Sequence, residues 1–342
     1  MGSASETDGL LGFVSSLRGG DGLRVEESLG DGYVRLRVSE AERRQAKHDV
    51  RCVEDAVIEL LRNARDAGAT RIFVGTAREG DIRTLVVVDD GAGIPPDMHA
   101  RVFDARVTSK LDTMRMDRWG VHGRGMALYS IRENAHSAEV MRSEVGCGCA
   151  LRVVFDVSSL PERADQSTWP KVTGDAKNYT VRGPHNIYRT CVEFALEERG
   201  TCNVYVGSPS ETLATMRARA DHGVSSLPAQ AQDARQLASI ARELGIDVSE
   251  RNAHRVLRGQ IAPLVNAATR VTGMRSRRGA RTQEPTVRRL SLTAEDEEVL
   301  RSALSDAFAS VADRYYVRLT ADPAIRVGEG KMTVVYEYVE DD

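Results

Sequence analysis

The segment Glu59–Gly68, with the sequence ELLRNARDAG, constrains this chain more than any other. In a helix, Glu59 and Asn63 lie one turn apart on the same face, while the leucines and alanines around them can turn toward a core. A carboxylate can orient and polarise a water molecule, and an amide oxygen can ligate a hard cation such as Mg²⁺. The pair therefore indicates either chemistry or a solvated helix face, and the rest of the chain has to decide between them.

The composition indicates a globular protein. The chain has 342 residues, 41% of them hydrophobic and 28% charged, which is enough for one large domain or two to three ordinary ones. The formal net charge of −3 gives no global signature of nucleic-acid binding. No apolar run approaches the roughly 18 residues of a membrane span, so no membrane partner is expected. Residues 1–32 are rich in Gly, Ser and acidic residues, which predicts a flexible leader without a secretory signal.

The five cysteines favour free thiols in a reducing cytoplasm over a metal site. Their number is odd and they are scattered along the chain. Cys147 and Cys149 are too close together for a usual zinc knuckle and have no second pair nearby. We therefore expect a cytoplasmic protein without structural zinc.

Apolar periodicity predicts alternating strands and helices up to about residue 160. Ser39 followed by Glu42 forms a capping box, and we expect one helix to run unbroken from there through residues 49–58 to its end at Gly68. The other expected elements of this region are strands at 33–38, 71–76, 83–88, 139–142 and 149–155, and a helix at 126–135.

The remaining half of the chain is less regular. We expect strands at Asn186–Leu196 and Cys202–Val206, and helices over residues 228–270 that form an ordinary helical hairpin rather than a helix-turn-helix. A helix at 291–312 and strands at 315–319 and 331–339 follow. The predicted organisation is a leader at 1–32, a domain at 33–160, a linker and strand-rich region at 161–230, a helical segment with a basic loop at 231–290, and a C-terminal helix with strands at 291–342.

Two glycine-spaced turns accompany the helix motif. An acidic residue at a strand end opens Asp89-x-Gly91-x-Gly93, and a second turn, Gly120-x-x-Gly123-x-Gly125, opens a helix. Glycines permit close backbone approach and positive φ, and amides at a helix N-terminus bind phosphate oxygens. Each turn alone is a weak signal, but the ordered set of three motifs is specific.

This ordered set resembles the GHKL ATPases, the superfamily of gyrase, heat-shock chaperones, histidine kinases and MutL. Within it, the chain is most similar to MutL-like ATPase domains over residues 45–157, because residues 66–72, 108–110 and 124–131 share the MutL spelling. The resemblance implies an α/β (α+β sandwich) Bergerat-type ATP-binding domain, with a mixed sheet, helices on one face, and the nucleotide between those helices and a lid. A second α+β region with helical and basic segments follows it.

The resemblance also implies residue roles, with ATP and Mg²⁺ as cofactors. Glu59 would be the general base of an ATPase, Asn63 would hold Mg²⁺, and Asp89 would accept a hydrogen bond from the adenine amino group. The complete set of implied nucleotide-binding residues is Asn63, Asp66, Ala67, Asp89, Gly91, Gly93, Ile94, Thr108, Ser109, Lys110, Gly120, Val121, His122, Gly123, Arg124, Gly125 and Met126. The contact that other members make to adenine from the last strand stays open, with Cys149 as the nearest small polar side chain.

We therefore expect an ATP-driven conformational switch that hydrolyses ATP and forms a homodimer in its ATP-bound state. A histidine-kinase-like signalling protein, with His48 as the phosphate acceptor, and a non-hydrolysing ATP-gated binding module are the alternatives. The lysine that a second domain sends into the ATP site of related proteins would be Lys171, Lys177 or Lys331.

A basic segment indicates one further partner. Arg270–Arg289 contains seven arginines and a single acid, Glu284, and can contact a nucleic-acid phosphate backbone. A solvated loop is the equal alternative, and the absence of interleaved aromatics argues against base stacking there.

Overall fold

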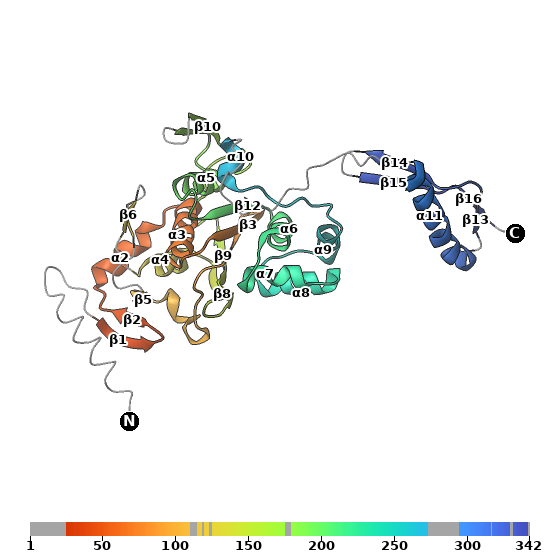
Figure 1. Cartoon of the computed structure of the whole chain (residues 1–342). Helices are drawn as coiled ribbons and strands as arrows, with labels where there is room; N and C mark the ends of the chain where they lie inside the picture. The colour runs from red at the N-terminus through yellow and green to blue at the C-terminus, as the bar shows by residue number, and fades with distance from the viewer. Residues whose placement is uncertain are drawn as a thin grey trace, which may run out of the picture. The chain divides into compact units, whose positions relative to one another are not determined.

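A five-stranded mixed sheet forms the centre of the first part of the chain. Its strands, in spatial order, are β12 (Asn203–Gly207), β3 (Arg71–Glu79), β4 (Ile82–Asp89), β9 (Cys149–Asp156) and β8 (Ser137–Ser143). The expected hairpin between β3 and β4 is present, with a tight turn at Gly80, whose φ is +59°. β4, β9 and β8 pair antiparallel, whereas β12 pairs parallel with β3. The fold is therefore α+β (Figure 1).

The computed structural model describes residues 25–109, 115–117, 120–122, 125–174, 179–272, 294–315, 317–328 and 331–340. The chain divides into two units, Met1–Ser276 and Arg277–Asp342. The first unit contains the whole five-stranded sheet, so β12 and the helices around it share a hydrophobic core with the strands that precede residue 160.

The single helix expected between Ser39 and Gly68 is two helices with a break between them. α2 (Glu40–Asp49) begins with the predicted capping box, in which Ser39 accepts from the Glu42 amide and Glu42 accepts from the Ser39 amide. The helix does not continue into the Glu59 motif, because α3 (Val53–Asp66) starts anew after extended residues at Val50 and Cys52. α3 ends as predicted, with Gly68 at φ +76°.

The segment Asn186–Leu196 is a helix, not the predicted strand. α5 (Ile187–Glu197) is capped by Asn186, whose side chain accepts a hydrogen bond from the Arg189 amide at 2.9 Å. The same side chain is fully buried and donates to two backbone carbonyls, those of Asp165 and Thr168. The predicted strand at Cys202–Val206 is confirmed as β12.

Helices cover both faces of the sheet, and those on the second face come from residues after 157, where the family resemblance ends. Side chains alternate along a strand, so neighbouring residues of β3 serve opposite faces. Ile72 and Val74 join a core with α3, α5 and α4 (Ala127–Asn134), and Phe73 joins a second core with four further helices. Those four helices are α6 (Pro209–Arg219), α7 (Gly223–Gln230), α8 (Ala234–Glu243) and α9 (Glu250–Leu257).

Smaller elements complete the first unit. They are β1 (Val25–Gly30), β2 (Tyr33–Leu36), η1 (Pro96–Met98), η2 (Arg101–Phe103), β5 (Val107–Thr108), β6 (Arg115–Asp117), β7 (Gly120–His122), β10 (Lys171–Gly174), β11 (Tyr179–Arg182) and α10 (Ala267–Thr272). β1, β2 and β5 form a small antiparallel sheet at the edge of the unit.

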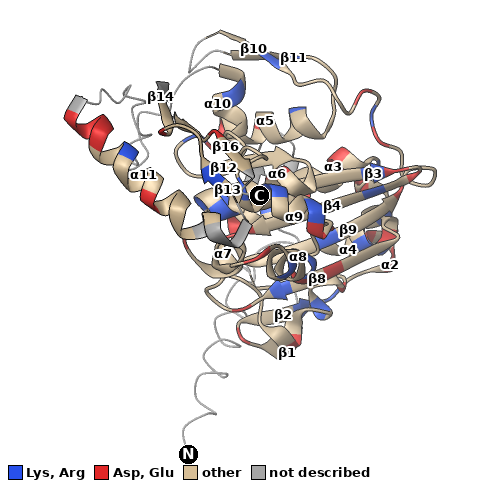
Figure 2. Ribbon diagram, turned by 90° about the vertical axis from the view of Figure 1, so that its right-hand side faces the viewer, with Lys and Arg blue, Asp and Glu red and all other residues tan. Residues whose placement is uncertain are grey.

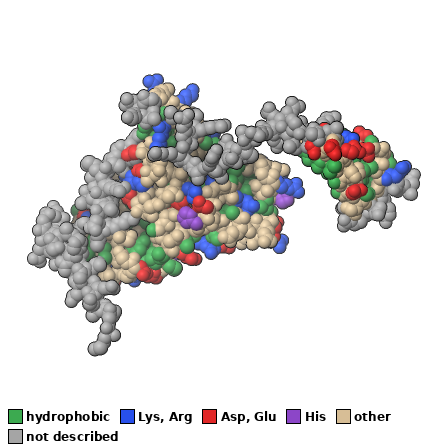
Figure 3. Space-filling view, viewed as in Figure 1, with side chains coloured by type: hydrophobic (Ala, Val, Ile, Leu, Met, Phe, Trp, Pro, Cys, Tyr) green, Lys and Arg blue, Asp and Glu red, His purple; other side chains and the backbone are tan. Residues whose placement is uncertain are grey.

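The described residues of the second unit form one long helix and two two-stranded sheets. Its elements are α11 (Ala294–Tyr315), β13 (Val317–Leu319), β14 (Ala324–Gly328), β15 (Lys331–Val335) and β16 (Tyr338–Glu340). Three acidic residues occupy the first turn of α11, where the helix dipole favours negative charge (Figures 2 and 3). Phe308 of α11 stacks on Tyr336 with ring centroids 5.0 Å apart. In the part of the chain that the structure describes, no helix combines the length and apolar character needed to cross a bilayer.

Candidate functional site

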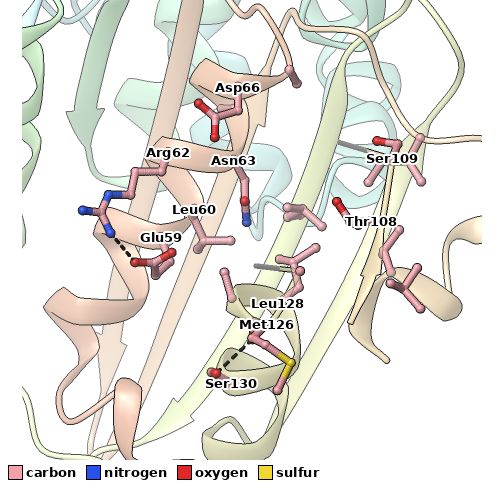
Figure 4. A pocket seen from close by; sticks show the side chains of 18 of the residues that line it. Glu59, Leu60, Arg62, Asn63, Asp66, Thr108, Ser109, Met126, Leu128 and Ser130 are labelled. Carbon is pink, nitrogen blue, oxygen red and sulfur yellow. Dashed lines mark hydrogen bonds and ion pairs between the residues drawn. The ribbon is translucent and has the colours of Figure 1, made fainter. Parts of the chain in front are cut away.

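A cavity of about 750 Å³ opens between α3, the ends of β4 and β9, and the start of α4. Its opposite wall is the segment that carries Thr108 and Ser109 (Figure 4). Eleven of the predicted site residues that the structure describes line it. These residues are Glu59, Asn63, Asp66, Ala67, Asp89, Gly93, Ile94, Thr108, Ser109, Gly125 and Met126. The structure therefore brings residues from the three motifs to one cavity.

α3 presents Glu59 and Asn63 to this cavity, as their spacing predicts. Its apolar side is held by Leu60, Leu61 and Ala64, which are all buried in the core. The Asn63 amide points into the cavity, and its Nδ2 atom is buried without a hydrogen-bond partner among the described residues (Figure 4). A buried polar atom without a partner is costly, so a ligand that uses it is a natural explanation.

Arg62 is a site residue that the sequence motif did not single out. Its Nη1 atom lies 2.6 Å from Glu59 Oε1, and its side chain is only 3% exposed. Residues three apart on a helix are neighbours, so the i, i+3 spacing was the available signal. The ion pair fixes the Glu59 carboxylate on the cavity wall (Figure 4).

The Asp89 turn is closed by backbone contacts that require glycine. Asp89 Oδ1 accepts from the Gly91 amide at 2.8 Å. A Cβ at Gly91 would lie 2.8 Å from the Ala67 carbonyl oxygen, and one at Gly93, whose φ is +72°, would lie 1.9 Å from a backbone oxygen. Gly91 itself is behind the cavity wall rather than in it. Gly148, whose Cβ would lie 2.1 Å from the Asp89 carbonyl oxygen, is a further required glycine that the sequence analysis missed.

Cys149 lies directly beside Asp89. The two residues are register partners in β4 and β9, and both line the cavity. Burial of the thiol, and then the negative charge of Asp89, raise the pKa of Cys149 far above its usual range. Cys149 therefore stays a neutral thiol, so the only hydrogen bond that it can donate is a weak one. Cys149 is therefore a small polar side chain that faces the cavity beside Asp89.

The lid side of the site is described in part. Ser109 and Tyr33 of β2 both line the cavity, and burial raises the pKa of the Tyr33 hydroxyl. Gly120, Val121 and His122 form strand β7, paired with β6, and α4 begins at Ala127 just after Gly125 and Met126. The predicted residues Lys110, Gly123 and Arg124 lie outside the described residues.

Of the candidate lysines, Lys171 is described in the same unit as the cavity and is not part of the described wall. Lys171 is exposed on β10, and Lys331 belongs to the second unit, while Lys177 lies outside the described residues. His48 is an exposed residue in the last turn of α2 and is also not part of the described wall.

Comparison with known proteins finds matches to the same part of the chain that carries the three motifs. Residues 48–159 match the family described as histidine kinase-, DNA gyrase B-, and HSP90-like ATPase. The DNA mismatch repair protein MutL of Thermus aquaticus is 39% identical over 125 residues, which are 36% of this chain and 23% of that protein. MutL of Brucella abortus is 49% identical over 74 residues, 21% of this chain and 12% of that protein.

These matches cover one domain of this chain. The matched part spans less than a quarter of the length of the curated relatives. Within that part, the family match, the mixed sheet and the cavity agree with the resemblance drawn from the motifs. Residues 48–159 are therefore a GHKL ATP-binding domain of the histidine kinase-, DNA gyrase B- and HSP90-like ATPase family.

Proposed function

We propose that this domain binds ATP with Mg²⁺ in the cavity and hydrolyses it. The observation that supports this most is that three motifs, which lie within about 70 residues of sequence, contribute to one cavity of suitable size. Small-molecule sites are concave and carry a few placed polar groups on a largely apolar lining. The cavity has that character, with Leu60, Val87 and Ile94 among its apolar residues.

The adenine end of the site is the Asp89 turn. A buried carboxylate that faces a cavity can accept a hydrogen bond from an exocyclic amine, and Asp89 is 5% exposed. Gly93 and Ile94 would contact the base, because they continue the same wall. The neutral thiol of Cys149 adds a small polar contact beside the carboxylate.

The phosphate end is marked by Asn63 and the start of α4. A half-turn of the Asn63 amide about its last side-chain bond would place the carbonyl oxygen, a ligand that Mg²⁺ accepts, where the unpartnered Nδ2 atom lies. Asn63 would then hold the ion, which neutralises phosphate charge when bound. The free amides at the N-terminus of α4 favour phosphate oxygens in the same place.

Glu59 is the proposed general base for the attacking water. It lies one turn from Asn63 on the cavity wall, so a water between the carboxylate and the terminal phosphate would be within reach of both. Arg62 donates a hydrogen bond to Glu59 Oε1, which orients the carboxylate.

We further propose that hydrolysis drives a conformational switch in the cytoplasm, with a homodimer in the ATP-bound state. A role on nucleic acid is supported by the relatives, which are DNA mismatch repair proteins, and by the arginine-rich segment 270–289. Most of that segment lies outside the described residues. Arg270 is described, and its guanidinium lies 4.0 Å from the Trp169 ring centroid.

One experiment separates hydrolysis from the kinase and binding-module alternatives. Incubation of the purified chain with γ-labelled ATP should release free labelled phosphate and leave the protein unlabelled. Acid-labile label on the protein that disappears in His48→Gln would instead identify a kinase. Binding of ATP with neither product would leave the non-hydrolysing module as the function.

A further inference from the structure

Arg106 adopts a backbone conformation that is unusual for its residue type. Its φ is +61°, in the left-handed region that residues with a Cβ rarely occupy. Two hydrogen bonds hold it there: the Arg106 amide donates to the Gly125 carbonyl at 2.9 Å, and the Leu36 amide donates to the Arg106 carbonyl at 3.0 Å. Strained residues held by their surroundings cluster at functional sites. Arg106 is thus fixed between β2 and the residues that open α4.

The Arg106 side chain reaches the cavity wall with donor capacity to spare. It is 11% exposed, and its Nη2 atom pairs with Glu42 Oε1 of α2. Its Nε atom is buried without a hydrogen-bond partner among the described residues. A guanidinium is always charged and presents its donors as a planar fork that fits phosphate.

The charges of the cavity explain why such a donor matters. The described wall contains five acidic residues, Glu42, Asp49, Glu59, Asp66 and Asp89, and two cationic ones, Arg62 and Arg106. Arg62 is paired with Glu59, deep on α3. Arg106, the other described cation, is hydrogen-bonded through its backbone to Gly125, next to the N-terminus of α4, which is the positive end of the helix dipole.

We propose that Arg106 recognises the phosphate chain of the nucleotide, and that Glu42 holds Arg106 in the empty site until phosphate replaces it. This inference rests on the proposed function, since it concerns how the same cavity distinguishes nucleotides. Glu42 acts as an intramolecular competitor for the guanidinium, so it lowers the affinity for triphosphate.

The exchange is possible without unwinding α2. Glu42 uses its other oxygen, Oε2, to accept from the amide and hydroxyl of Ser39, at 2.8 and 3.0 Å. That capping interaction survives when Arg106 leaves. The Glu42 side chain is 41% exposed, so water can take the place of the guanidinium on Oε1.

Two substitutions should change affinity in opposite directions. Calorimetry would measure Mg-ATP and AMP binding by the wild-type chain, Arg106→Gln, Glu42→Gln and the control Arg35→Gln. Arg106→Gln should weaken ATP binding by about 10- to 100-fold, the scale of a hydrogen bond to a charged group, and change AMP binding by much less. Glu42→Gln should strengthen ATP binding by about two- to fivefold, as expected for loss of a partly exposed competing ion pair.

The controls isolate the proposed contact. Glutamine at position 42 keeps the capping box, so α2 is preserved. Arg35 pairs with Glu27 and Asp104 outside the cavity, and its substitution removes the same charge, so its ratio of ATP to AMP affinity should equal that of the wild type.

An equal loss of ATP and AMP affinity in Arg106→Gln, or none, would overturn the inference. If Arg106→Gln does not fold, Glu42→Gln decides alone, because unchanged or weaker ATP binding there would also overturn it. A wild-type chain that binds neither nucleotide would contradict the proposed function itself, an outcome distinct from these.

Discussion

The two faces of the central sheet are built from the same strands but have different roles. On one face, α3 and α4 stand apart at the strand ends and leave a cavity of about 750 Å³, lined by carboxylates, amides and glycines. On the other face, α6–α9 close over Phe73, Val86 and Val88, and their buried residues form one apolar cluster. Successive side chains of a strand point to opposite faces, so a single strand contributes residues to both.

This difference teaches where to look for function in such a fold. Polar groups are retained on the open face at an energetic cost, as the unpartnered Asn63 amide illustrates. The closed face buries even its threonines with partners, since Thr212 donates to the Val74 carbonyl at 3.3 Å. Substitutions on the open face should therefore change chemistry, and those on the closed face should change stability.

The largest expected effect is on the open face. Glu59→Gln keeps the size of the side chain but removes the basic oxygen, so hydrolysis should fall by about 10²- to 10⁴-fold while ATP binding survives. Phosphate release and nucleotide affinity would both be measured.

Glu54→Gln is the matched control, because the same helix carries it away from the cavity. Glu54 is 6% exposed and accepts from the Arg163 amide, so its loss should lower stability and spare the rate. Wild-type hydrolysis in Glu59→Gln would mean that Glu59 is not the base.

The closed face should respond in the opposite way. Leu213 of α6 is fully buried in the second core, so Leu213→Ala should destabilise the first unit by about 2–5 kcal/mol. The denaturation midpoint would report the loss, and ATP affinity below that midpoint should equal that of the wild type. Reduced affinity in a folded variant would show that the two faces are not independent.

A smaller, pH-dependent effect on stability is expected at His222. His222, just before α7, bonds to Asp221 at 2.8 Å and to the Asp90 carbonyl at 3.3 Å. The Asp221 hydrogen bond raises the pKa of His222 above its usual 6.5. Its contribution is therefore complete below pH 6.5 and disappears as the pH rises through the folded-state value.

The side chain is half exposed, which limits this contribution to about 0.2–1 kcal/mol. Unfolding of wild type and His222→Gln would be compared at about pH 5.5 and about pH 9. The difference between the two proteins should be present at the lower pH and absent at the higher one. An equal difference at both pH values would show that the charge of His222 does not cause the effect.

Local signals predicted the open face well. The β3–β4 hairpin, the capping box at Ser39, the end of α3 at Gly68 and the start of α4 all follow from short-range patterns. The position of Cys149 opposite Asp89 depends on sheet register, which no single segment encodes. Arg106 was missed for a similar reason, since its role depends on partners from α2 and Gly125.

The elements after residue 160 were harder to predict. α5 is apolar at positions that fit both a strand and a helix, and only the Asn186 cap distinguishes them. The family resemblance ended at residue 157, so it carried no information about α6–α9. These helices pack on the second face of the sheet, where they bury Phe73 and Tyr205. This packing depends on tertiary contacts and not on a local sequence pattern.

Titration of the whole chain with ATP, with and without Mg²⁺, tests the central claim most directly. Calorimetry should show Mg-ATP binding with a dissociation constant between micromolar and millimolar, about −8 to −4 kcal/mol, and weaker binding when Mg²⁺ is chelated. Asp89→Asn should abolish binding at the adenine end, and Asn63→Ala should remove the dependence on Mg²⁺. No heat and no thermal shift at millimolar ATP, or wild-type affinity in Asp89→Asn, would contradict the assignment of this cavity as a nucleotide site.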